Sequence, residues 1–90
     1  MNYEWDQAKA DLNLRQHGVD FPRAVDALED PFKIEELDLR ESYGEERVQT
    51  IGWARGGILF VVTTLRSHDI CRIILARKAT RHERQRYEDR

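Results

Sequence analysis

The sequence predicts an α+β fold in which two N-terminal helices and one C-terminal helix pack on one side of a four-stranded antiparallel meander. Three observations support this prediction. Two segments with helix-capping residues precede residue 31, apolar and charged residues alternate from Phe32 onward, and Thr80 with Glu83 forms a capping box near the end. Ninety residues are enough for one core, so we expect a single domain over residues 1–90.

The first elements are a short extended segment and a capped helix. Residues 3–5 are expected to be extended. A helix is predicted over residues 7–17, because Asp6 can accept hydrogen bonds from the first turn and Gly18 can adopt the left-handed conformation that ends a helix.

A second helix is predicted over residues 22–29. Pro22 suits the first turn of a helix, and the Asp-Pro pair at residues 30–31 ends it. Val25 and Leu28 mark the side of this helix that should be buried.

Four strands are predicted in the middle of the chain. They cover residues 32–39, 46–54, 58–65 and 70–77. In the first strand, the inward residues would be Phe32, Ile34, Leu37 and Leu39. The alternation shifts by one residue between Ile34 and Leu37, which a β-bulge can accommodate. Residues 40–45 form a loop, and a turn at residues 55–57 makes a hairpin of the second and third strands. Because residues 58–62 are apolar on both faces, that strand should be central in the sheet.

Charge is divided unevenly along the chain. The net charge is −2, but residues 1–65 contain seven Lys and Arg against thirteen Asp and Glu, whereas residues 66–90 contain eight against four. A basic end on an acidic protein indicates an anionic partner, unless the two parts neutralise one another in the fold. Cys71 is the only cysteine, and the apolar run at 58–62 is too short to span a bilayer, so we expect a soluble cytoplasmic protein.

Cations gather where the last strand meets the last helix. Arg77 and Lys78 are adjacent and point in different directions, so they can reach two sides of one bound phosphate. Backbone N–H groups at Thr80 and Arg81 also attract anions, and Arg84 continues the basic surface. The alternative is an ordinary solvated surface with pairs such as Arg84 and Glu88. The three histidines are in separate elements without ligand spacing, so no metal or cofactor is predicted.

Three motifs resemble the BrnT family of type II toxin–antitoxin ribonuclease toxins. They are WDxxKxxxN…HGVxF at residues 5–21, YGEER at 43–47 and IxARKATxxExxxY at 73–87. Gln16 and Leu75 depart from the basic residue and the Ser that are usual there. The resemblance implies a RelE-like fold and a hydrolase that cleaves RNA and arrests growth. It also implies a cognate antitoxin with a ribbon-helix-helix DNA-binding part. The toxin would contact DNA only within the complex with this antitoxin.

The resemblance suggests metal-independent cleavage by attack of the ribose 2′-hydroxyl on the neighbouring phosphate. Positive side chains would stabilise the phosphorane, Glu45 or His17 would be the base, and Tyr87 or Lys78 would protonate the leaving oxygen. The predicted catalytic residues are Arg77, Lys78, Arg47, Glu45, His17 and Tyr87. The predicted RNA-binding residues are Lys9, Arg72, Thr80, Arg81 and Arg84.

Several of these residues have structural alternatives. His17 can simply close its helix, Glu45 can pair with Arg47, and Tyr87 can anchor the last helix. The alternative function is a non-catalytic module that binds RNA or an antitoxin.

Overall fold

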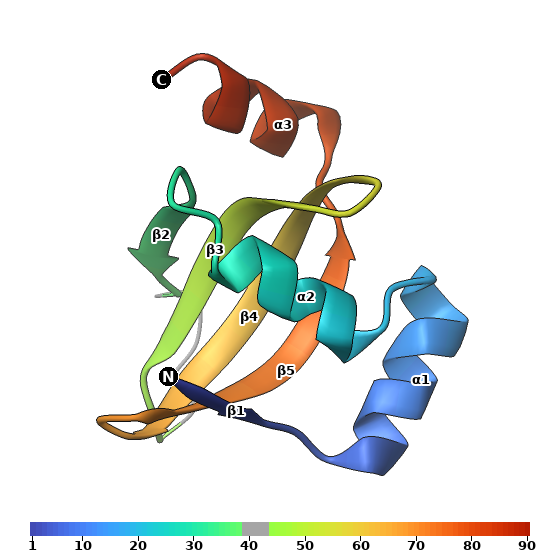
Figure 1. Cartoon of the computed structure of the whole chain (residues 1–90), viewed down its shortest axis with the longest axis vertical. Helices are drawn as coiled ribbons and strands as arrows, with labels where there is room; N and C mark the ends of the chain where they lie inside the picture. Colours follow the sequence, from blue (N-terminus) through green and yellow to red (C-terminus); the bar gives the residue numbers. More distant parts are fainter. Residues whose placement is uncertain (39–43) are drawn as a thin grey trace.

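The computed structural model describes residues 1–38 and 44–90, which form three helices and one five-stranded sheet (Figure 1). The helices are α1 (Gln7–His17), α2 (Phe21–Leu28) and α3 (Arg81–Glu88). The strands are β1 (Asn2–Glu4), β2 (Ile34–Leu37), β3 (Arg47–Ala54), β4 (Gly57–Ser67) and β5 (Ile70–Lys78), in the order β1-β5-β4-β3-β2. None of these helices is long and apolar enough to cross a membrane.

The α+β class is confirmed, and the sheet is larger than predicted. Strands β2 to β5 form the expected antiparallel meander with β4 in the centre. The count of four strands is wrong, because β1 adds a fifth strand parallel to β5, with Glu4 opposite Arg72. The extended N-terminal segment therefore finds its partner near the other end of the chain.

The helices lie on both faces of the sheet. Helices α1 and α2 cover one face, where Phe21, Leu59 and Val61 belong to the main buried cluster (Figure 1). Helix α2 lies directly against β3, since a Cβ at Gly52 would be 2.3 Å from the Ala27 carbonyl oxygen. The prediction that all helices share one face is wrong for α3, which packs at one end of the opposite face.

The contact of α3 with the opposite face is made by Tyr87. Its ring packs against a second cluster that contains Ile51, Phe60 and Val62. These side chains alternate with those of the main cluster along β3 and β4, which places them on the other side of the sheet.

Helix boundaries follow the capping residues. Asp6 accepts from the Lys9 N–H and begins α1, and Gly18 ends it at φ 70°. Helix α2 begins one residue earlier than predicted because Asp20 caps it. At α3 both hydrogen bonds of the predicted capping box between Thr80 and Glu83 are formed.

Strand β2 is shorter and more exposed than the alternating pattern predicts. Phe32 is 65% exposed and Leu37 is 52% exposed, so the expectation that both face the core is wrong. Strand β2 is an edge strand, and α2 packs on β3, β4 and β5 instead. Ile34 is half-buried against the second cluster, and Leu39 lies outside the described residues with most of the predicted 40–45 loop.

The buried carboxylate of Asp30 joins three parts of the fold. It accepts hydrogen bonds from the Phe32 N–H at 2.9 Å, the Trp53 N–H at 2.8 Å and the Tyr87 hydroxyl. Burial raises the pKa of Asp30, but these hydrogen bonds and the charge of Arg90 outweigh burial and hold the pKa below its usual value.

Stability should therefore fall in acid partly through Asp30. A carboxyl whose pKa is lower in the folded state stabilises the protein above its unfolded pKa of about 3.9, and this contribution is lost as pH falls through the folded value. The free energy of unfolding of a Tyr87→Phe protein should be about 1 kcal/mol lower than that of the wild type at neutral pH. Its loss of stability between neutral pH and about pH 3 should be smaller than that of the wild type, as measured by urea unfolding. Equal losses would contradict this role of Asp30.

Candidate functional site

A polar pocket of about 240 Å³ opens where α1 meets one end of the sheet. Helix α1 and strands β3, β4 and β5 all contribute to its wall. The polar lining residues are Asp6, Lys9, Glu45, Arg47, Arg66 and Arg72. The structure thus brings together four predicted site residues, which are Lys9, Glu45, Arg47 and Arg72.

The register of the sheet places two of the arginines on the same face, one on each side of the central strand β4. Thr64 on the central strand β4 is paired with Arg47 of β3 on one side and with Arg72 of β5 on the other. Residues directly opposite each other in a sheet project from the same face, so both guanidinium groups reach the same region.

Two β-bulges border this pocket. Between Val62 and Thr63 the partner on β5 changes from Leu75 to Ile73, which leaves Ile74 unpaired. Between Leu65 and Ser67 the partner changes from Cys71 to Ile70, which leaves Arg66 of β4 unpaired. Both extra residues, Ile74 and Arg66, line the pocket. Bulges are common beside functional sites because they redirect a side chain.

Acidic groups neutralise part of the positive charge. Glu45 lies 3.6 Å from the Arg47 guanidinium. Glu4, which does not line the pocket, lies 2.6 Å from Arg72 and 3.5 Å from Arg66.

Lys9, like Arg66, is an exposed cation of the pocket. Only its backbone N–H is engaged by Asp6, and within residues 1–38 and 44–90 its ammonium group forms no ion pair. Lys9 is therefore not paired with the nearby carboxylates of Glu4 and Asp6. The ammonium group is available to an anion in the pocket.

A second, less polar pocket of about 300 Å³ adjoins the first and shares Lys9 and Ile74 with it. His17 at the end of α1 lines this second pocket. So do Gln16 and Leu75, the two departures from the resembled motifs. His17 therefore lines the pocket next to the one that Glu45 lines.

Arg77, near the end of β5, is held in an ion pair with Glu83 of α3. Its guanidinium donates to both carboxylate oxygens of Glu83, at 2.8 and 3.0 Å, and lies 3.9 Å from the centroid of the Phe60 ring. Burial raises the pKa of Glu83, but the hydrogen bonds from Arg77 and Thr80 outweigh this effect and lower the pKa. Arg77 therefore fastens the start of α3 to the sheet.

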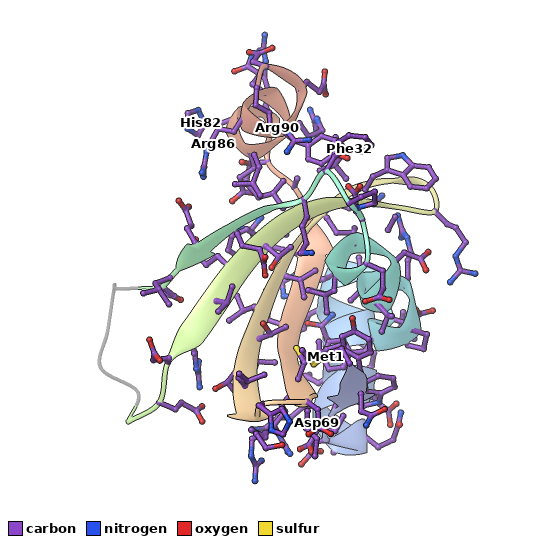
Figure 2. All side chains as sticks on the ribbon, turned by 60° about the vertical axis from the view of Figure 1, so that its left-hand side comes forward. Met1, Phe32, Asp69, His82, Arg86 and Arg90 are labelled. Carbon is purple, nitrogen blue, oxygen red and sulfur yellow. The ribbon has the colours of Figure 1, made fainter. Side chains whose placement is uncertain are left out.

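The structure does not bring Arg77 and Lys78 together with Arg47. Arg77 pairs with Phe60 and Arg47 with Thr64, and four positions along β4 correspond to about 13 Å. Lys78 is exposed at the end of β5. Figure 2 shows His82 and Arg86 of α3, together with Arg90 just beyond it, at the opposite end of the molecule from Asp69, which lies in the β4–β5 turn.

The remaining predicted residues lie on α3 or at its start. The Tyr87 hydroxyl donates to Asp30, and burial together with that carboxylate raises the pKa of Tyr87. Thr80 caps α3, Arg81 is exposed, and Arg84 donates to the Ala79 carbonyl at 3.3 Å.

Three charged residues around the pocket were missed by sequence reasoning, namely Glu4, Asp6 as a lining residue, and Arg66. Arg66 lies just beyond the third predicted strand, which ends at residue 65, whereas β4 continues to Ser67. No local pattern links Glu4 to Arg66, because they meet only through the pairing of β1 with β5.

Comparisons with known proteins agree with the resemblance. The model of the family described as ribonuclease toxin BrnT of type II toxin–antitoxin systems matches residues 5–83. The fold is similar to the crystal structure of the Brucella abortus ribonuclease toxin BrnT, with a TM-score of 0.66 and 23% identity over 90% of this chain and 99% of that chain. No curated protein matches the sequence. Because the family model covers most of the chain, the protein belongs to the BrnT family of type II toxin–antitoxin ribonuclease toxins.

Proposed function

We propose that the chain is an endoribonuclease toxin that cleaves RNA at the polar pocket. The main support is that three separate elements bring their residues to one concave site: Lys9 from α1, Arg47 from β3 with the nearby Glu45, and Arg72 from β5. A phosphate in this pocket would meet several positive groups and one carboxylate, which is the combination that cleavage by an internal nucleophile requires.

The reaction uses the ribose 2′-hydroxyl as the nucleophile. The 2′-oxygen forms a bond to phosphorus and the bond to the 5′-oxygen breaks, which yields a 2′,3′-cyclic phosphate and a 5′-hydroxyl. Glu45 accepts the proton of the 2′-hydroxyl, with His17 of the adjoining pocket as the alternative base, and a solvent water molecule supplies the proton of the leaving oxygen. Lys9, Arg47 and Arg72 stabilise the additional negative charge of the phosphorane.

The basic junction between β5 and α3 binds the RNA backbone away from the bond that is cleaved. Lys78, Arg81 and Arg84 are exposed there and do not line the polar pocket. Such contacts add affinity that depends on salt and not on base sequence. In this arrangement Arg77 and Tyr87 position α3.

A cognate antitoxin is the proposed protein partner, in keeping with the family. It would bind tightly, mask the polar pocket with acidic or apolar segments, and contact DNA through a ribbon-helix-helix part. The toxin chain then reaches DNA only within that complex.

Purified protein, freed from antitoxin, should cleave naked RNA in the presence of EDTA. We expect fragments with 2′,3′-cyclic phosphate ends, and an RNA with 2′-deoxy substitutions should remain intact because it lacks the nucleophile. The products can be identified by mass spectrometry.

Two other outcomes are informative. Cleavage only after ribosomes are added would make ribosome-bound RNA the substrate. Salt-dependent binding without cleavage under either condition would contradict the proposed activity and favour the non-catalytic module.

A further inference from the structure

One carboxylate beside the polar pocket serves two arginines. The Oε2 atom of Glu4 lies 2.6 Å from Nη1 of Arg72 and 3.5 Å from Nη1 of Arg66. Both arginines line the pocket and Glu4 does not. The group of three thus has one positive charge in excess, and it presents its guanidinium side to the pocket.

Three different strands produce this arrangement. The parallel pairing of β1 with β5 places Glu4 directly opposite Arg72. Arg66 is the unpaired residue of the β4 bulge. The short N-terminal strand therefore delivers a negative charge to the two arginines, in addition to extending the sheet.

The two contacts of Glu4 differ in strength. Arg72 donates a hydrogen bond to Glu4, and its side chain is 30% exposed. Arg66 is 51% exposed, and at 3.5 Å its contact is an ion pair without such a hydrogen bond. An exposed ion pair of this kind contributes little free energy, so a better anion can replace it. Of the two arginines, Arg66 is thus the one that can exchange Glu4 for another anion.

We propose that Arg66 is a phosphate-binding residue of the polar pocket and that Glu4 weakens phosphate binding by holding its guanidinium. The proposal rests on the proposed function, because it takes the phosphate to be that of an RNA substrate. A phosphate offers the paired acceptor oxygens that a guanidinium binds through two parallel hydrogen bonds. When RNA binds, Arg66 leaves Glu4 for the phosphate, and Glu4 remains paired with Arg72.

Removal of the Glu4 charge should therefore strengthen binding. The probe is an RNA oligonucleotide with 2′-deoxy substitutions, which binds without being cleaved, and inorganic phosphate is the second ligand. We expect Glu4→Gln to lower the dissociation constant of the oligonucleotide about threefold or more at moderate salt. The control Glu88→Gln changes the net charge equally on the exposed side of α3 and should have a much smaller effect.

The Arg66→Gln protein should show the opposite effect. Its oligonucleotide affinity should fall about threefold or more, and the slope of log affinity against log salt should decrease by about one. If the Glu4→Gln protein has lost its cooperative thermal unfolding, the Arg66→Gln protein tests the proposal by itself.

The outcomes separate this proposal from the proposed activity. Equal affinities of the Glu4→Gln and Glu88→Gln proteins, or an unchanged salt slope for Arg66→Gln, would overturn the proposal. A response to inorganic phosphate but not to the oligonucleotide would also overturn it, because the site would then take free phosphate. Tighter oligonucleotide binding by a protein that cuts no RNA would refute the nuclease activity and leave the role of Glu4 intact.

Discussion

A Lys9→Gln protein should cleave RNA at least about 100-fold more slowly than the wild type, as expected when one preorganised group that stabilises transition-state charge is removed. Lys9 lines both adjoining pockets, and its ammonium group is exposed without an ion pair among the described residues. The measurement is the initial rate of RNA cleavage in EDTA at fixed salt.

The fold should tolerate this substitution. The cap of α1 uses the backbone N–H of residue 9, which the variant retains, and the side chain is exposed. Thermal unfolding should accordingly be unchanged. A folded Lys9→Gln protein with the wild-type rate would remove Lys9 from the mechanism.

The second large effect is expected for stability, at Asn13. This residue is 6% exposed, and its amide donates to the carbonyls of Ala76 at 2.8 Å and Val19 at 2.9 Å. Its carbonyl accepts from the Ala76 N–H at 3.2 Å. Strand β1 pairs with β5 only as far as Arg72, so further along this edge the Asn13 side chain takes the place of a neighbouring strand.

Asn13→Asp should lower the free energy of unfolding by about 2–4 kcal/mol, because two buried carbonyls lose their donor and a carboxylate replaces an amide. Urea unfolding measures this loss. Gln16→Ala is the matched control on the exposed side of the same helix, where we expect a change within about 0.5 kcal/mol. If Asn13→Asp were as stable as the control, the amide would not secure the edge of β5.

The parts of the fold that depend on local chemistry could be predicted from the sequence. The bounds of α1 agree to the residue because Asp6 and Gly18 are adjacent to it. The hairpin and the capping box at Thr80 are equally local. The partner of β1 and the face on which α3 packs could not be predicted, because they depend on contacts between distant residues such as Tyr87 and Asp30.

The same distinction holds for the candidate site. Motif resemblance indicated Lys9 and Arg47, which the fold brings into one pocket with Arg72. The expectation that Arg47 meets Arg77 was wrong, because sequence gives no register between β3, β4 and β5 and so no distance along the strands. The pairing of Glu4 with Arg66 and Arg72 was missed for the same reason.

The most direct test of where the reaction takes place compares two lysines that are both exposed, Lys9 in the polar pocket and Lys78 at the end of β5. Cleavage rates of the Lys9→Gln and Lys78→Gln proteins are measured in the same assay. We expect a loss of about 100-fold or more for Lys9→Gln and of less than about tenfold for Lys78→Gln. The reverse order would place the reaction at the strand–helix junction and contradict the assignment to the polar pocket.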